Sequence, residues 1–488
     1  MNDKQIKSKV ISSLFWKFME RLGTQGIQFI VQIALARLIL PEEYGSIALI
    51  AIFISFANVF VQYGFNTALI QKKDANETDF SSVFFLSLVV AGLFYAILFV
   101  SAPLIAEFFE NSMLTSLLRV LSLTLFLGGL NSIQNAVIAR NLEFRKLFYS
   151  SLGAVVGSGI VGITMAYNGF GAWALVAQQL TNQLMVASIL WFTVRWRPGF
   201  LFSLESLKGL FSFGWKLLVS ALINMLYNNI QSLFIAKIYD PAMLGYFNRG
   251  QQFPALIVAN INGSIQSVMF PALALKQDNL HRVKEMVRRA IVTSAFFIFP
   301  MMVGLAVVAE PLVKILLTDK WLPCVPFLQI SCAAYALLPI HTANLQAINA
   351  LGRSDIFLKL EIVKNVVSLA ILGISLSYGI YAIAAGMFFS SVASSFINAY
   401  PNKNLLNYSY IQQLKDVMPS LLLALAMGMI IYCFSWFNMN PGLTLTIQVC
   451  VGVIIYFGMA KILKFECLAY LMITAKELLD NRKKRKIR

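Results

Sequence analysis

Residues 36 to 45 read ARLILPEEYG and residues 236 to 245 read AKIYDPAMLG, and the likeness of these two stretches decides the fold. Both fit the pattern Ala-(Arg/Lys)-x-x-x-Pro-x-x-x-Gly, with all four matched positions offset by 200 residues. A Trp-Lys pair precedes each copy, at Trp16-Lys17 and at Trp215-Lys216. Because proline favours helix starts and glycine favours turns, each copy predicts a turn followed by a new helix. The chain therefore contains an internal repeat.

The composition places this repeat in a membrane. Of the 488 residues, 58% are hydrophobic and 12% are charged, and the mean hydropathy is +0.73. Soluble globular chains carry about 25% charged residues. Continuous apolar runs of about 20 residues predict membrane-spanning helices and exclude the alternating strands of a lipid-facing barrel. We predict an all-α polytopic membrane protein whose spans, about fourteen in number, lie at roughly 11–38, 44–70, 80–106, 112–138, 147–167, 170–194, 209–238, 245–271, 289–311, 324–350, 356–378, 380–400, 414–437 and 442–462.

The basic residues orient these spans. With residues at the span edges included, 29 of the 39 lysines and arginines fall in alternate connections that begin with the N-terminus. The opposite connections hold Arg37, Lys314 and Lys320. Because cytoplasmic loops concentrate Lys and Arg, both termini are predicted to be cytoplasmic. The basic end NRKKRKIR, residues 481–488, is expected to contact anionic lipids of the inner leaflet, and no soluble domain supports nucleic-acid binding.

The repeat extends beyond the opening stretches. Four further residues recur at an offset of 213, as Asn131, Arg140, Phe144 and Lys146 in the first copy and Asn344, Arg353, Phe357 and Lys359 in the second. Six expected spans separate the copies of the opening stretch, so both halves enter the membrane in the same sense, as in parallel transporter repeats. We predict six-helix halves at 1–208 and 209–413, two additional helices at 414–463 and a basic cytoplasmic tail at 464–488.

Three segments carry a resemblance to a known family. LPEEYGSIAL, QYGFNTALIQKK and VIARNLEFRKL, which begin at residues 40, 62 and 137, resemble the polysaccharide transporter family. These are Wzx-type flippases of the multidrug/oligosaccharidyl-lipid/polysaccharide (MOP) superfamily, and the WzxC-like branch is the most similar. The likeness covers nearly the whole chain in order, length and number of spans, and its motifs are specific over the first 150 residues.

The resemblance implies a transporter of the bacterial cytoplasmic membrane and not an enzyme. Its cargo would be undecaprenyl-pyrophosphate-linked oligosaccharide, moved by alternating access to the outer leaflet for capsule, exopolysaccharide or O-antigen (lipopolysaccharide) synthesis. A polysaccharide polymerase and glycosyltransferases are further candidate partners.

Charges within the expected spans favour an anionic cargo. Seven cations lie there, with Glu20 and Glu361 as the accompanying acids: Lys17, Arg21, Arg119, Lys216, Lys237, Arg249 and Lys364. Ionisable groups in a membrane usually face a cavity, and an excess of cations suits a pyrophosphate. Arg37 and Lys237 end spans one and seven on the outer side, about 30 Å along the helix from Lys17 and Lys216. Snorkelling of these end-of-span cations to the headgroups is the alternative.

Spans one and seven each carry a polar stripe along one helical face. The first consists of Ser13, Lys17, Glu20, Arg21, Thr24, Gln28 and Gln32, and the second of Ser212, Lys216, Ser220, Asn224, Tyr227, Asn228 and Gln231. Lipid-facing helices do not carry such stripes, so we expect the two to face each other across a wet cavity. Arg21 and Lys216 are then the chief candidates for a phosphate clamp.

Uncharged polar residues in the spans allow two interpretations. Asn58, Gln62, Asn66, Asn260 and Ser264 could bind sugar hydroxyls, with Tyr227 stacking on a sugar ring, or they could form interhelical hydrogen bonds. Glu20 is the first candidate for ion coupling, whereas Glu361 lies three residues before Lys364 and could be neutralised by it. No cofactor or metal site is expected, and coupling to protons or sodium stays open.

Other functional classes fit less well. A multidrug cation antiporter of the same superfamily should bury more acids than cations, and this chain has the reverse. A flippase for a lipid-linked peptidoglycan precursor would share the cationic cavity and stays open. A glycosyltransferase or polymerase needs a soluble loop with catalytic acids or histidines, but no connection exceeds roughly 18 residues and the chain has two histidines, His281 and His341.

Overall fold

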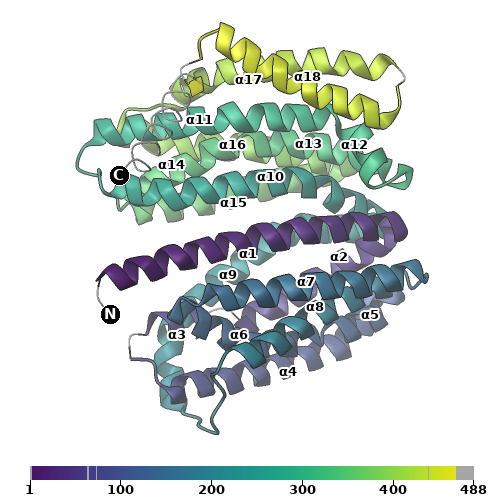
Figure 1. Ribbon diagram of the computed structural model, residues 1–488, viewed down its shortest axis with the longest axis vertical. Coiled ribbons are helices and arrows are strands. Elements are labelled where there is room, and N and C mark those ends of the chain that lie inside the picture. Colours follow the sequence, from purple (N-terminus) through teal and green to yellow (C-terminus); the bar gives the residue numbers. More distant parts are fainter. Residues whose placement is uncertain (1–2, 63–64, 73, 438, 466, 469–488) are drawn as a thin grey trace, which may run out of the picture. The chain divides into compact units, whose positions relative to one another are not determined.

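The computed structural model describes residues 3–62, 65–72, 74–437, 439–465 and 467–468, and every element in these ranges is a helix (Figure 1). The chain divides into two compact units after Gly245. The first unit contains α1 (Asp3–Leu38), α2 (Pro41–Gln62), α3 (Phe65–Gln71), α4 (Glu77–Phe108), α5 (Met113–Leu121), α6 (Thr124–Asn141), α7 (Phe144–Tyr167), α8 (Ala172–Thr193) and α9 (Leu204–Ile238).

The second unit begins at Tyr246, inside α10 (Pro241–Ala274). It continues with α11 (Leu280–Val307), α12 (Ala309–Leu316), η1 (Asp319–Cys324), α13 (Val325–Ala336), α14 (Leu338–Ala350), α15 (Ser354–Ser375), η2 (Leu376–Tyr378), α16 (Ile380–Leu406), α17 (Tyr410–Cys433), η3 (Phe434–Phe437) and α18 (Pro441–Ile462). Its core joins α11, α14, α17 and α18, and the hydroxyl of Tyr456 donates to the carbonyl of Phe296 at 2.7 Å inside that core.

Local sequence sets the ends of these helices. Pro41 and Pro241 are the first residues of α2 and α10, which confirms the helix starts predicted from the repeated Pro-x-x-x-Gly pattern. Asn76 and Asp79 form a capping box at the start of α4, in which each side chain accepts a hydrogen bond from the backbone N–H of the other. Ser203 caps α9 by accepting from the N–H of Ser206.

The helical class predicted from hydropathy is confirmed. Each expected span coincides with one helix or with two consecutive helices, such as α5 and α6 or α13 and α14. Ten helical segments within the described residues are long and apolar enough to cross a membrane. The helices α1, α8, α10 and α15, whose sequences are more polar, fall outside this group, so the count of about fourteen stays a prediction.

Helix α9 packs within the first unit, on α2, α3 and α4. At its N-terminal end, the N–H groups of Gly199 and Ser203 donate to the hydroxyls of Ser81 and Ser82 on α4, at 3.0 and 2.9 Å. At its other end, Lys237 donates to the carbonyl of Phe108, which ends α4, at 2.6 Å. Because both ends are bound to one helix, α9 lies with the first unit. The division into halves at 1–208 and 209–413 stays a prediction. The basic tail lies outside the described residues beyond 468.

Candidate functional site

The two copies of the opening motif meet inside the first unit. A Cβ atom added at Gly45 would overlap the carbonyl oxygen of Pro241 and would lie 3.1 Å from the nitrogen of Gly245. A Cβ atom added at Gly245 would in turn lie 3.1 Å from the carbonyl carbon of Pro41. The first turns of α2 and α10 therefore cross in backbone contact, and each copy of the motif provides the glycine that this approach requires. Sequence reasoning explained these glycines as turn residues and missed their packing role.

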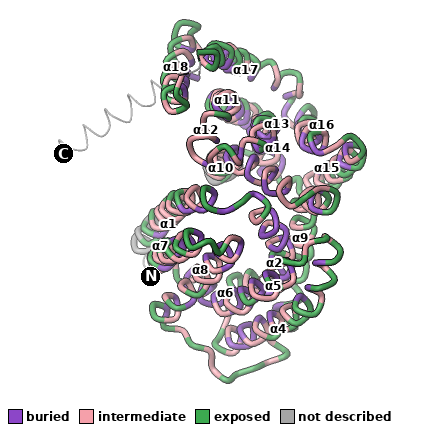
Figure 2. The backbone as a smooth tube through the Cα atoms, turned by 90° about the vertical axis from the view of Figure 1, so that its right-hand side faces the viewer, coloured by how far each residue is buried: buried purple, intermediate pink, exposed green. Residues whose placement is uncertain are grey.

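The helices with polar stripes, α1 and α9, lie on opposite sides of the first unit (Figure 2). On α9 the stripe is exposed at successive turns, through Ser212, Lys216, Ser220, Asn224 and Asn228. On α1, Lys17 and Arg21 are exposed and Gln28 is half-buried, whereas Ser13 is buried and donates to the carbonyl of Leu142 at 2.6 Å. The stripe on α9 is thus largely exposed, whereas the stripe on α1 is exposed at Lys17 and Arg21 and is half-buried or buried at its other residues.

Several of the predicted cavity cations are held by protein groups. Lys17 pairs with Glu20 at 2.8 Å, and Lys364 pairs with Glu361. Arg119 donates to the carbonyl of Phe99 at 3.2 Å and lies 4.3 Å from the centre of the Phe99 ring. Glu361 is thus neutralised by Lys364, the possibility raised from their spacing, and Glu20 has Lys17 as a partner on its own helix.

Two further cations are anchored more firmly. Besides the Phe108 carbonyl, Lys237 contacts Glu110 at 3.3 Å and lies 4.7 Å from the centre of the Phe108 ring. Arg249 is buried, donates to the side-chain oxygen of Gln252 at 2.6 Å and lies 5.2 Å from the ring centre of Trp321. Such contacts are typical of cations that join helices.

The remaining cations are Arg21, Arg37 and Lys216, and all three side chains are exposed. Within the described part of the chain, no hydrogen bond or ion pair of the Lys216 ammonium is found. Arg21 and Lys216 both belong to the first unit, on α1 and α9 respectively.

The uncharged polar candidates divide into two groups. Asn58 and Gln62 are hydrogen-bonded to each other at 3.1 Å, and the hydroxyl of Ser132 on α6 donates to Asn66 at 3.1 Å. The Ser132–Asn66 bond is interhelical, as in the second interpretation, whereas the Asn58–Gln62 bond lies within α2. Asn260 and Asn224 each donate to a carbonyl four residues earlier on their own helices, α10 and α9, while Tyr227 is half-buried on α9. The side chain of Ser264 is outside the described part.

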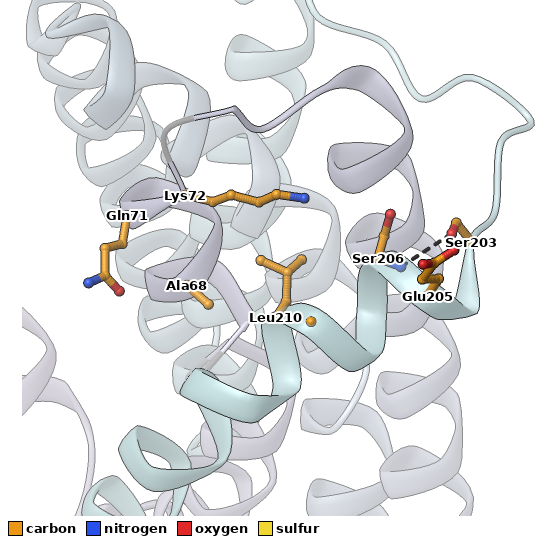
Figure 3. Close-up of a pocket in the computed structure, with 8 residues that line it drawn as sticks. Ala68, Gln71, Lys72, Ser203, Glu205, Ser206 and Leu210 are labelled. Carbon is orange, nitrogen blue, oxygen red and sulfur yellow. Dashed lines mark hydrogen bonds between the residues drawn. The ribbon is translucent and has the colours of Figure 1, made fainter.

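The motif residues of QYGFNTALIQKK and VIARNLEFRKL form a cluster that sequence reasoning did not predict. Lys72 forms an ion pair with the buried Asp79 at 2.7 Å, and Arg140 donates to the carbonyls of Leu69 and Lys72 at 3.1 and 2.7 Å. A cavity of about 580 Å³ lies beside this cluster, where Lys72 extends from the end of α3 towards Ser206 on α9 (Figure 3). The cluster joins α3, α4 and α6, so these motifs fix helix ends. In the sequence, this cluster was indicated only by the density of charged residues in the two motifs next to the expected spans.

A duplicated set of apolar helices with an exposed cationic stripe defines a class, that of polytopic membrane transporters. Comparison with known proteins then identifies the family. Residues 34–326, more than half of the chain, match the model of the polysaccharide biosynthesis protein family, and the chain belongs to this family. The resemblance drawn from the motifs is confirmed, as is the expectation of a membrane transporter that is not an enzyme.

Three relatives match over most of their length. Teichuronic acid biosynthesis protein TuaB of Bacillus subtilis (strain 168) is 25% identical, over 92% of this chain and 95% of its own. Succinoglycan biosynthesis transport protein ExoT of Rhizobium meliloti (strain 1021) is 24% identical, over 92% of each chain. Lipopolysaccharide biosynthesis protein WzxC of Escherichia coli (strain K12) is 22% identical, over 87% of this chain and 89% of its own.

Solved structures share the fold. Lipid II flippase MurJ in an inward closed conformation has a TM-score of 0.74 at 16% identity, over 93% of this chain and 98% of that chain. A multidrug resistance MATE family transporter of the MOP superfamily in an inward-facing conformation has a TM-score of 0.58 at 16% identity, over 78% and 96% of the two chains. At these identities the likeness concerns the fold alone.

Proposed function

We propose that this protein is a flippase that moves undecaprenyl-pyrophosphate-linked oligosaccharide from the cytoplasmic to the outer leaflet for surface polysaccharide synthesis. The observation that carries the proposal is the exposed stripe on α9, on which Lys216 stands among Ser212, Ser220, Asn224 and Asn228 without a protein partner in the described residues. Contact of a polar helical face with lipid is energetically unfavourable, whereas the same face can form hydrogen bonds with a hydrated sugar chain. Membership of a polysaccharide biosynthesis family supplies the saccharide.

The charged and the uncharged stripe residues have different proposed roles, which follow from their chemistry. Arg21 and Lys216 would hold the pyrophosphate, since cations bound to phosphate oxygens form charge-assisted hydrogen bonds. The amides of Gln28, Asn224 and Asn228 both donate and accept, which suits sugar hydroxyls. Glu20, ion-paired with Lys17 three residues away, would couple transport to an ion if that pair opened during the cycle.

The test uses a lysine on α9 as its internal control. Lys208 is exposed on the same helix as Lys216 but lies two turns nearer the N-terminus, before the expected span 209–238. Loss of a charged hydrogen-bond donor costs on the order of 1.5–3 kcal/mol, or about ten- to a hundred-fold in affinity. Lys216→Ala and Arg21→Ala should each reduce surface polysaccharide strongly in a strain lacking the native gene, whereas Lys208→Ala should not. Arg21→Lys should be partly active because a point charge replaces a bidentate fork.

Two measurements make this outcome interpretable. The amount of protein in the membrane shows whether each variant is inserted, and the accumulation of lipid-linked oligosaccharide shows whether synthesis continues without export. Normal polysaccharide from both alanine variants at normal protein level would reject the clamp. A peptidoglycan-precursor flippase predicts a different result: loss of the gene would then impair cell-wall synthesis and leave surface polysaccharide intact.

A further inference from the structure

A second cavity of the first unit is lined by no residue of the polar stripes. Its volume is about 920 Å³, and it opens between the ends of α4, α6, α7 and α8. Its wall includes three cations, Arg140, Lys146 and Arg195, together with the aromatic rings of Phe80 and Trp196. We call it the interfacial pocket. Every lining residue belongs to the first unit, so its shape is set by that unit alone.

The cations of the interfacial pocket are differently constrained. Arg140 is fixed by its two hydrogen bonds to the carbonyls of Leu69 and Lys72, and Lys146 is paired with Glu143 at 2.6 Å. Arg195 is exposed at the rim, and in the described residues its guanidinium has no hydrogen bond or ion pair. With Glu77 and Glu143 as the carboxylates of the wall, the cations remain in excess. A positioned arginine beside an uncompensated one suits a phosphate group.

Two aromatic rings form the apolar part of the pocket wall. The centres of the Phe80 and Trp196 rings lie 6.1 Å apart, and both residues line the pocket. The indole nitrogen of Trp196 is buried, so the indole offers the pocket its apolar surface and not its N–H. An apolar wall beside cations suits a lipid, whose headgroup is charged and whose chains are apolar.

The location of the pocket identifies the ligand. The connections at its mouth, between α3 and α4, α6 and α7, and α8 and α9, are three of the basic connections expected at the cytoplasmic surface. Aromatic residues gather at that membrane boundary, and basic pockets between spans on the cytoplasmic side bind lipid headgroups. We propose that the interfacial pocket binds the phosphate headgroup of an anionic phospholipid of the cytoplasmic leaflet. No stripe residue lines this site, and the proposal does not depend on which cargo is moved.

The experiment measures lipid retention by the purified full-length protein. Wild type and variants are exchanged into micelles containing phosphatidylglycerol or phosphatidylcholine, and the retained lipid is counted by native mass spectrometry. Wild type should retain phosphatidylglycerol in preference to phosphatidylcholine. Arg195→Gln should weaken this retention about tenfold, because it removes a charged hydrogen-bond donor. Lys208→Gln removes the same charge outside the pocket and should leave retention unchanged.

Three outcomes would overturn the proposal. If the wild type retained the two lipids equally, the site would not be selective for anionic lipid. If Arg195→Gln retained as much phosphatidylglycerol as the wild type, the interfacial pocket would not be the binding site. If inorganic phosphate displaced phosphatidylglycerol completely, the site would be one for a soluble phosphate and not for a lipid. Should Arg195→Gln fail to fold, Lys146→Gln tests the same wall with a residue that is already partly neutralised by Glu143.

Discussion

The crossing of the two motif copies makes Gly45→Ala the sharpest test of the fold. A Cβ atom at Gly45 would lie 2.6 Å from the carbonyl carbon of Pro241, about 0.8 Å closer than the 3.4 Å at which ordinary contact begins. The neighbouring atoms are backbone atoms, so no rotamer change relieves the overlap. The first turns of α2 and α10 would have to move apart.

The expected magnitude follows from two opposing effects. Overpacking of a tight contact costs about 1–3 kcal/mol, while alanine in place of glycine inside a helix contributes about 0.4–1 kcal/mol in the other direction. Gly26→Ala is the matched control, because Gly26 lies inside α1 and nothing lies within 4 Å of an added Cβ atom. The control should therefore be neutral or stabilising, whereas Gly45→Ala should be destabilising.

Thermal unfolding of the purified protein in detergent shows whether each substitution stabilises or destabilises the protein. For a unit of this size, 1 kcal/mol corresponds to a change of about 2–4 °C in Tm. Gly45→Ala should lower Tm by several degrees relative to Gly26→Ala. Gly245→Ala should act in the same direction, since its Cβ atom would approach the backbone of Pro41. A Tm for Gly45→Ala at or above that of Gly26→Ala would refute the crossing.

Two further substitutions separate structural ion pairs from functional ones. Lys237→Met should lower the free energy of unfolding by about 1 kcal/mol through the lost hydrogen bond to the Phe108 carbonyl, while the lost ion pair with Glu110, whose side chain is 85% exposed, should contribute little. Thermal unfolding and surface polysaccharide are measured on the same variant. If export were lost while stability was unchanged, Lys237 would be a cargo-binding residue. Asp79→Asn should cost less than the ~3–5 kcal/mol of a fully buried pair, because Lys72 is 39% exposed, yet clearly more than Glu77→Gln in the same turn. Equal unfolding temperatures for those two variants would contradict a structural role for the Lys72–Asp79 pair.

The elements of the fold were readable from sequence because each depends on local or one-dimensional patterns. Hydropathy located the helices, proline marked the starts of α2 and α10, and the offset of 200 residues revealed the repeat. Contacts between distant segments carry no such pattern. The role of Gly45 could have been inferred only by asking where a symmetry axis must bring identical positions together. The attachment of α9 to Ser81 and Ser82 depends on an irregular connection whose path no periodicity encodes.

The same limit applies to the candidate site. Helical periodicity groups the polar residues of α9 into one stripe, because their spacing belongs to a single helix, and Lys216 and Asn224 of this stripe are exposed. Periodicity could not distinguish Lys237 or Arg249 from Lys216, because the contacts of Lys237 and Arg249 are made with other elements or depend on side-chain conformation. Charge within a span therefore predicts a set of candidates, and only tertiary contacts divide that set into cations that join helices and cations available to a cargo.

The repeat itself diverges in its contacts more than in its residues. Arg140 donates to the carbonyls of Leu69 and Lys72 at the end of α3, whereas its counterpart Arg353 pairs with Asp355 on the surface. Asn344 accepts from Asn402 at 2.6 Å and donates to Gln413 of α17 at 2.7 Å. The second unit thus uses a repeated asparagine to bind one of the two additional helices into its buried core. Because Asn344 and Gln413 are buried and hydrogen-bonded to each other in both directions, α17 is part of the core of that unit together with the repeat helices.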